Sequence, residues 1–135
     1  MQGRETARGD VPRRSRHDWW GVVLEAPDAG ALARFYSELL GWPIDQEDPE
    51  EAAIAPEDGV AYLGFQTSPG YLPSAWPERE GAQQMQAHLD FEVSDLDAAV
   101  EHALELGARL AGYQPQNDVR VLVDPAGHLF CLYLG

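Results

Sequence analysis

The sequence predicts an α+β protein built from two tandem βαβββ modules, whose mixed or antiparallel sheets curl around a shared cavity. The first observation is a change of period within residues 87–107, where apolar residues alternate up to Ser94 and follow helical spacing after Asp95. The second is a repeat: residues 28–41 and 95–107 each run from an aspartate through an amphipathic helix to a glycine, about 67 residues apart. Two copies of such a unit can cover apolar faces that neither could bury alone.

The N-terminal half is expected to open with a tail and continue into the first module. Residues 1–17 mix five arginines with Gly and Pro and contain few apolar residues, which predicts a disordered tail. A strand over 18–26 leads into a helix over 29–40, which Asp28 caps and Gly41 ends. Three strands complete this module: one is expected to begin at 42–44, and the other two to span 52–55 and 60–67. An acidic turn is expected at 45–51 and a further turn at 56–59.

A Pro-rich connection, residues 68–84, separates the first module, about 18–67, from the second, about 85–135. Its three prolines argue against a regular element, and a segment of this length serves as a linker or as a flap over a ligand. Trp76 lies inside it and is the aromatic residue that we assign to a ligand lid. The second module is expected to contain strands at 87–93, 108–111, 119–123 and 128–134, a helix at 96–106, and turns at 114–118 and 124–127.

The strand that precedes the second helix has one polar face. His88, Asp90 and Glu92 alternate with apolar residues that include Leu89 and Phe91. Because the apolar side chains are expected to pack against the helix, the polar side chains should face the cavity. His88 would there be a ligand-binding group, whereas on an ordinary solvated strand it would be a structural residue.

Composition limits the classes of partner. The chain carries 23 acidic and 9 basic residues, for a net charge of −14. Such a surface repels nucleic acid and anionic membranes and favours cationic ligands if it steers any, although solubility alone would also explain it. No apolar run approaches the roughly 20 residues that span a bilayer. With no recognisable secretory leader and a single cysteine, Cys131, a cytoplasmic location is expected.

Four segments carry a resemblance to a known superfamily. They are VVLEAPDAGALARFYSELLGWPI (22–44), GFQTSPGYLPSAWPE (64–78), HLDFEVSDLDAAVEHALELGARL (88–110) and VLVDPAGHLFCLYL (121–134). Together they resemble the vicinal-oxygen-chelate superfamily of glyoxalases, bleomycin-resistance proteins and extradiol dioxygenases, and within it the glyoxalase-like subgroup. The resemblance implies paired βαβββ modules around a ligand cavity. It leaves open whether the protein is an enzyme, because fold does not determine activity.

The resemblance also implies where a divalent metal would bind. Metal-dependent members use four side chains (His or Gln, Glu, His and Glu), one from each of four cavity-facing strands. The corresponding positions here are Gly21, Gln66, His88 and Cys131. One imidazole, one amide and one thiol match that set poorly, so neither a metal nor another cofactor is expected. If a metal does bind, the resemblance assigns it to His88 with Gln66 and Cys131.

The resulting hypothesis is a glyoxalase/bleomycin-resistance-like protein that binds a small organic ligand, cationic or aromatic, in the cavity. The residues expected to bind it are His88, Asp90, Gln66, Trp76 and Cys131, with His88 the best catalytic candidate. The alternative is a divalent-metal-dependent lyase, isomerase or dioxygenase with altered ligands, and a third reading is a partner-binding module. Neither nucleic acid nor a membrane is expected as a partner. A homodimer is a further option, because the superfamily pairs modules within or between chains.

Overall fold

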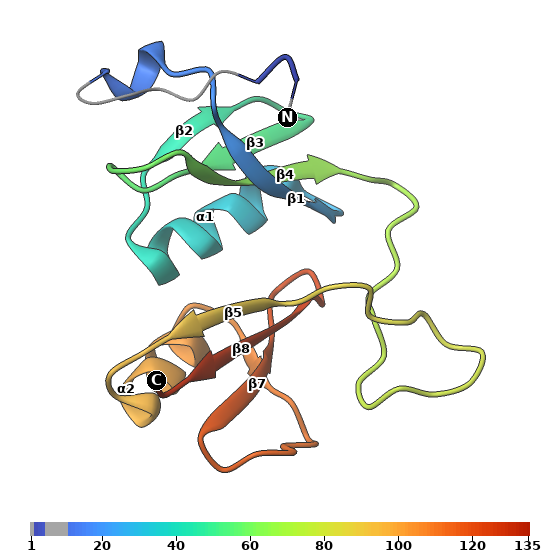
Figure 1. Cartoon of the computed structure of the whole chain (residues 1–135). Coiled ribbons are helices and arrows are strands. Elements are labelled where there is room, and N and C mark those ends of the chain that lie inside the picture. The colour runs from blue at the N-terminus through green and yellow to red at the C-terminus, as the bar shows by residue number, and fades with distance from the viewer. Residues whose placement is uncertain (1, 5–10) are drawn as a thin grey trace. The chain divides into compact units, whose positions relative to one another are not determined.

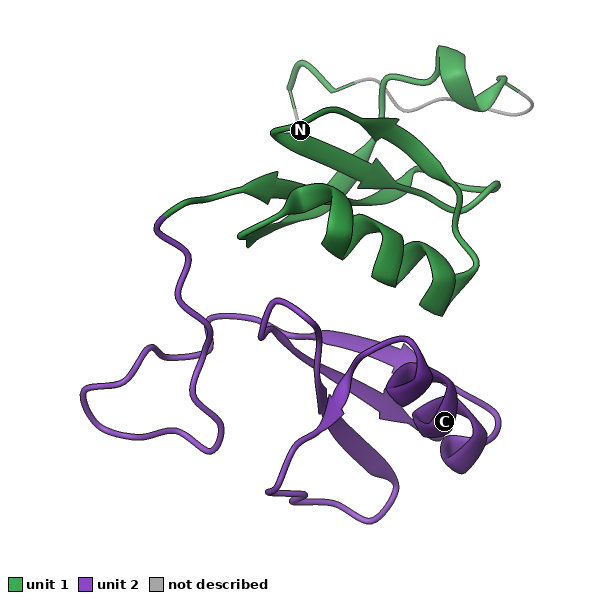
Figure 2. Cartoon of the chain, turned by 180° about the vertical axis from the view of Figure 1, so that it is seen from behind, with its two compact units in different colours: residues 1–69 green, residues 70–135 purple. Residues whose placement is uncertain are grey.

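The computed structural model describes residues 2–4 and 11–135, and the chain forms two compact units, residues 1–69 and 70–135 (Figure 2). Each unit contains one α-helix and one four-stranded sheet, so the predicted α+β class with two βαβββ modules is confirmed. The predicted connection falls almost entirely within the second unit. Neither α-helix in the described residues is long and apolar enough to cross a membrane.

The first unit holds a mixed sheet with the strand order β1-β4-β3-β2. Its strands are β1 (Trp20–Ala26), β2 (Ile44–Glu47), β3 (Glu51–Ile54) and β4 (Ala61–Thr67), and its helix is α1 (Ala29–Leu40). β1 and β4 run parallel, whereas β3 pairs antiparallel with both β4 and β2. α1 lies along one face of this sheet (Figure 1) and contacts β3 and β4. The opposite face is therefore free of any helix of this unit.

Helix α1 begins and ends where the sequence predicts. The Asp28 carboxylate accepts a 2.8 Å hydrogen bond from the Ala31 N–H, and Gly41 ends the helix at a φ of 66°, which favours glycine. The helix is held to the sheet by Tyr36, whose ring stacks on Phe65 of β4 with the centroids 5.8 Å apart. Burial of each of these rings contributes roughly 1.5–3 kcal/mol, so this pair anchors the unit.

Strand β2 differs from what was predicted for residues 45–51. The expected acidic turn over 45–51 is wrong for its first part, because residues 44–47 form a strand and only 48–50 remain as the turn. β2 is an edge strand that is exposed at every position. Its acidic side chains therefore stay in water while its backbone pairs with β3, an arrangement that also discourages pairing with other chains.

The second unit repeats the arrangement with the strand order β5-β8-β7-β6. Its elements are β5 (Leu89–Glu92), α2 (Leu96–Glu105), β6 (Arg109–Leu110), β7 (Val119–Val123) and β8 (Leu129–Tyr133). β5 and β8 run parallel, and the other pairs are antiparallel. Asp95 caps α2 by accepting a 3.0 Å hydrogen bond from the Ala98 N–H. β5 is shorter than predicted, so His88 lies one residue before the strand.

The two faces of the second sheet bury different residues. Phe130 and Leu132 are buried beside α2, and the ring of Phe91 lies 6.2 Å from that of Phe130. The opposite face carries a smaller apolar cluster against which the connection packs. This cluster consists of Ala111, Val121 and Leu129, with Trp76, Met85, Val123 and Cys131 packed against it.

The described part of the segment before β1 contains a short 3₁₀ turn and an ion pair. Of the predicted tail, residues 1 and 5–10 lie outside the described residues. A 3₁₀ turn, η1, covers Arg13–Ser15, and the Arg16 guanidinium donates hydrogen bonds of 2.9 and 2.7 Å to the buried Asp18 carboxylate. These bonds join two residues at the end of the segment, just before β1 begins at Trp20.

Candidate functional site

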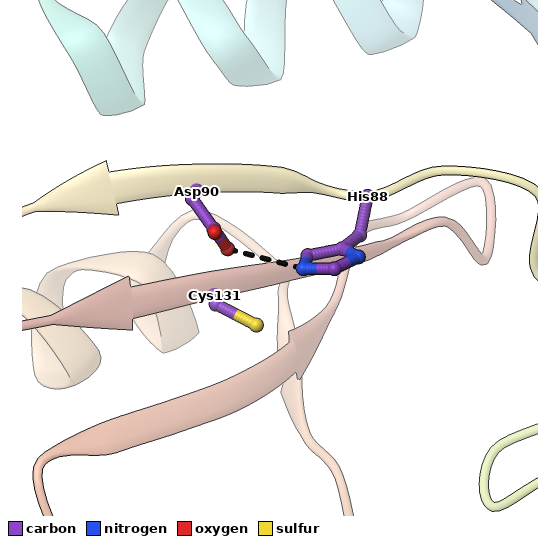
Figure 3. A group of neighbouring side chains, drawn as sticks. All are labelled: His88, Asp90 and Cys131. Carbon is purple, nitrogen blue, oxygen red and sulfur yellow. Dashed lines mark ion pairs between the residues drawn. The ribbon is translucent and has the colours of Figure 1, made fainter.

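Three side chains of the second unit bring a nitrogen, an oxygen and a sulfur together (Figure 3). Asp90 lies on β5, His88 just before it, and Cys131 lies directly opposite Asp90 on β8. Their ligating atoms all lie within 4.8 Å of one another, and His88 Nε2 is 3.3 Å from Asp90 Oδ1. The predicted polar face of this strand therefore meets Cys131 on the side of the sheet away from Phe130.

This cluster is open to solvent on one side and apolar on the other. The side chains of His88 and Asp90 are 39% and 55% exposed, so their ion pair is worth little by itself. Cys131 is half-buried against the apolar cluster that includes Val121 and Leu129. A small molecule could reach the imidazole and the carboxylate directly from the solvent.

Cys131 is held in its protonated form at neutral pH. Burial, followed by the negative charge of Asp90 and a hydrogen bond to it, raises the pKa of the Cys131 thiol to about 11. Because the thiolate is the nucleophile and the metal ligand, this thiol is a weak nucleophile at neutral pH. It lines the cluster as a small, largely apolar group.

The first unit has its own pocket, of about 440 Å³, on the face of the sheet away from α1. Its walls combine aromatic rings, acidic side chains and two amides. The lining residues are Trp19, Val23, Asp45, Gln46, Glu51, Ala52, Ala53, Ala55, Tyr62, Gly64, Phe65 and Gln66. Of the residues predicted to bind a ligand, Gln66 is thus placed in this pocket, while His88, Asp90 and Cys131 form the cluster of the second unit.

Gly21 is covered by an aromatic ring. Gly21 and Tyr62 are directly paired on β1 and β4, and the Tyr62 ring lies across the glycine. A Cβ atom at position 21 would come within 2.5 Å of ring carbon Cζ. A side chain at position 21 would therefore require the Tyr62 ring to move.

Arg13 lies beside two residues of this pocket, Trp19 and Asp45, and was not among the residues predicted from the sequence. Its guanidinium carbon lies 4.5 Å from the centroid of the Trp19 ring, and its Nη1 is 3.7 Å from Asp45 Oδ1. Arg13 Nε and Nη2 are buried and have no hydrogen-bond partner among the described residues. No local pattern marks this arginine within the tail, because its partners lie on other parts of the unit.

Trp76 is packed rather than free. Its indole Nε1 donates a 3.0 Å hydrogen bond to the Tyr113 carbonyl, and the two rings lie 5.8 Å apart. The ring also rests on the apolar cluster of the second sheet, the same cluster that Cys131 contacts. Its role as a lid stays a prediction, but its position over this face of the sheet is established.

The model of the glyoxalase-like domain family matches residues 21–133, which is most of the chain. The chain belongs to the glyoxalase-like domain family. No curated protein sequence matches it significantly.

Solved structures support the same fold for this glyoxalase-like chain. A glyoxalase/bleomycin resistance protein/dioxygenase family enzyme from Burkholderia phytofirmans PsJN has a TM-score of 0.62 at 21% identity, covering 83% of this chain and 94% of that chain. The fosfomycin resistance protein FosX from Mesorhizobium loti has a TM-score of 0.60 at 16% identity, covering 86% and 90%. A possible glyoxalase from Bacillus cereus has a TM-score of 0.62 at 14% identity, covering 84% and 95%. At these identities the likeness concerns the fold alone.

The residues of this glyoxalase-like chain do not fit the four-ligand metal set of the superfamily. The first position is Gly21, which has no donor atom and is covered by the Tyr62 ring. The last position is Cys131, which offers a soft sulfur donor where that set has a carboxylate. Hard divalent ions prefer oxygen and nitrogen donors, so these two positions do not complete such a site.

Proposed function

We propose that this glyoxalase-like protein binds a small organic cation with an aromatic part in the pocket of the first unit, without the four-ligand metal site of its superfamily. The observation that carries the proposal is the position of Arg13, whose guanidinium lies over Trp19 and beside Asp45. An aromatic face combined with a carboxylate is the chemistry that recognises organic cations. The chain's own arginine therefore marks a place where a cation is stabilised at the pocket.

The rest of the pocket suits such a ligand. Trp19 and Tyr62 offer ring surface, whereas Asp45 and Glu51 supply negative charge, and no basic residue is among the described lining residues. Gln66 and its neighbours offer amide groups that orient a ligand by hydrogen bonding. A volume of about 440 Å³ is in the range of small-molecule sites. His88, Asp90, Trp76 and Cys131 stay as predicted ligand-binding residues of the second unit.

Binding of phenyltrimethylammonium, compared with its neutral isostere tert-butylbenzene, tests the proposal. Saturable binding measured by calorimetry, together with quenching of tryptophan fluorescence, is expected for the cation and not for the isostere. Asp45→Asn should weaken binding about three- to ten-fold, because it removes one carboxylate beside the cation. Glu57→Gln, in an exposed turn outside the pocket, is the matched control and should bind like the wild type. Equal binding of both compounds, or an Asp45→Asn variant that binds as tightly as the wild type, would refute the proposal.

A second candidate is a divalent-metal-dependent lyase, isomerase or dioxygenase with altered ligands. The observation in its favour is the cluster of His88, Asp90 and Cys131, with ligating atoms within 4.8 Å of one another. Elemental analysis of protein purified without a tag, repeated on His88→Ala, tests it. Stoichiometric metal that is lost in the variant would favour this second candidate over the cation binder.

A further inference from the structure

The second unit contains a pocket of about 320 Å³ between the connection and the end of its sheet. Two contacts hold the connection against the sheet here. Pro73 packs so closely on Gly127 that a Cβ atom at position 127 would overlap the proline ring. Trp76 donates a hydrogen bond to the Tyr113 carbonyl. The pocket is therefore formed by anchored residues rather than by a free loop.

The charge of this pocket is opposite to that of the unit around it. Residues 70–135 include ten acidic side chains but only three basic ones, Arg79, Arg109 and Arg120. Arg79 and Arg109 both line the pocket, and none of its described lining residues is acidic. In a unit with this excess of acids, two arginines at one pocket concentrate positive charge where an anion could bind.

Both arginines are available to a ligand. Among the described residues, neither guanidinium has a hydrogen bond or an ion pair, whereas Arg120 donates two 2.9 Å hydrogen bonds to the carbonyls of Asn117 and Val119. Arg79 lies in the loop that the hydrogen bond from Ala75 N–H to the Gln83 carbonyl closes. Arg109 lies on β6. The two guanidinium groups thus come from separate elements.

The remaining walls are apolar or aromatic. Trp76 supplies an indole face, and Leu110, Val123 and Leu129 supply aliphatic surface. An arginine guanidinium binds a carboxylate through paired hydrogen bonds, while an apolar floor accommodates a hydrocarbon or an aromatic ring. The combination suits an anion with an apolar body better than an inorganic ion.

We propose that the pocket between residues 73–79 and strands β6 and β7 binds a small organic anion, a carboxylate attached to an apolar or aromatic group. Arg79 and Arg109 bind the carboxylate, and Trp76 contacts the apolar group. This site is separate from the cation pocket proposed for the first unit, and its ligand has the opposite charge.

Titration of the full chain with phenylacetate, and with the uncharged phenylacetamide, tests the proposal. Wild-type protein should bind phenylacetate saturably by calorimetry, more tightly than phenylacetamide, and less tightly as NaCl is raised. Arg79→Gln and Arg109→Gln should each weaken phenylacetate binding about ten-fold, because each removes a charge-assisted donor. Arg120→Gln is the matched control, since this arginine lies outside the pocket, and Asp45→Asn should also leave phenylacetate binding unchanged.

The outcomes separate this proposal from the proposed function. Absence of saturable phenylacetate binding, equal affinity for phenylacetamide, or wild-type affinity in the Arg79→Gln/Arg109→Gln double variant would overturn it. The comparison of the acid with the amide uses wild-type protein alone, so it remains decisive even if a variant is poorly folded. Loss of phenylacetate binding in Asp45→Asn would also overturn it, because the anion would then depend on the first unit.

Discussion

Asp90 and Cys131 face each other across β5 and β8, and the chemistry of each depends on the other. Burial is the main reason that the pKa of the Cys131 thiol is raised to about 11, and the Asp90 carboxylate adds to it. The thiolate fraction therefore grows as the pH rises toward 11 and levels off above it. Beside this protonated thiol, the His88 and Asp90 side chains are the more exposed members of the cluster.

Asp90→Asn should make Cys131 more reactive. The substitution removes the negative charge that opposes ionisation, so the pKa of the thiol falls while the contribution of burial remains. At pH 8 the rate of alkylation by iodoacetamide should increase about three- to ten-fold, since one pKa unit changes the thiolate fraction about ten-fold. Glu92→Gln, on the same face of β5 but two residues further along and paired with Tyr133, is the control. An unchanged rate in Asp90→Asn would contradict the assigned cause of the shift.

At the scale of single elements, β1 and the segment that precedes it shape the first pocket. β1 is an edge strand whose Gly21 is covered by the Tyr62 ring of the neighbouring β4. The preceding segment brings Arg13 to Trp19 and Asp45. A cationic ligand that uses the same ring and carboxylate would have to displace this arginine.

Arg13→Ala should therefore raise the affinity for phenyltrimethylammonium. Removing the competing guanidinium frees the Trp19 face and the Asp45 carboxylate, and Arg13 loses few bonds because two of its buried nitrogens have no partner among the described residues. An increase of about three- to ten-fold in the calorimetric binding constant is expected. Arg14→Ala, the neighbouring residue, should change nothing. Weaker binding in Arg13→Ala would show that the arginine supports the ligand rather than competing with it.

Gly21→Ala should destabilise the first unit. The new Cβ would lie about 2.5 Å from a Tyr62 ring carbon, so the ring must shift, at a cost of roughly 1–3 kcal/mol in the free energy of unfolding. Chemical denaturation measures this change. Gly70→Ala is the control, because no atom lies within 4 Å of a Cβ there. Adding Tyr62→Ala should recover part of the loss, and additive effects of the two substitutions would argue against the contact.

The whole molecule consists of two units of the same architecture and has a net charge of −14. The two units share an element order, an aspartate cap on the helix and a parallel pairing of their first and last strands. They differ in what their helix-free faces carry, with an aromatic and acidic pocket in one and an apolar cluster with two arginines nearby in the other. The two units thus share a fold, whereas the residues on their helix-free faces differ in chemistry. The shared cavity between modules and the homodimer stay predictions.

Salt should stabilise the whole protein. With 23 acidic against 9 basic residues, repulsion among the acids exceeds attraction, and added ions screen it. The Tm is expected to rise between low salt and about 0.5 M NaCl, where the screening length is only several Å. KCl should have the same effect as NaCl, which separates screening from specific binding of one cation. A Tm that falls with salt would mean that attractive ion pairs dominate instead.

Local signals explain which parts of the fold were predictable. α1 was predicted at its observed bounds and α2 to within one residue, because caps, helical periodicity and terminal glycines are all read from neighbouring residues. Residues 45–47 of β2 were assigned to a turn because their acidic composition outweighed a pairing that only β3 provides. The alternation of polar and apolar residues predicted for β5 is observed, and Cys131 pairs with Asp90 across β5 and β8. That this face lines a ligand cavity stays a prediction.

The sequence by itself determined the order of elements, the duplication and the family, because these depend on patterns within segments of ten to twenty residues. Only the tertiary structure decided that Tyr62 covers Gly21, that Arg13 lies against Trp19, and that Arg79 and Arg109 share a pocket. Each of these contacts joins residues from different elements. Their proximity depends on strand register and on how loops pack, which no local pattern encodes.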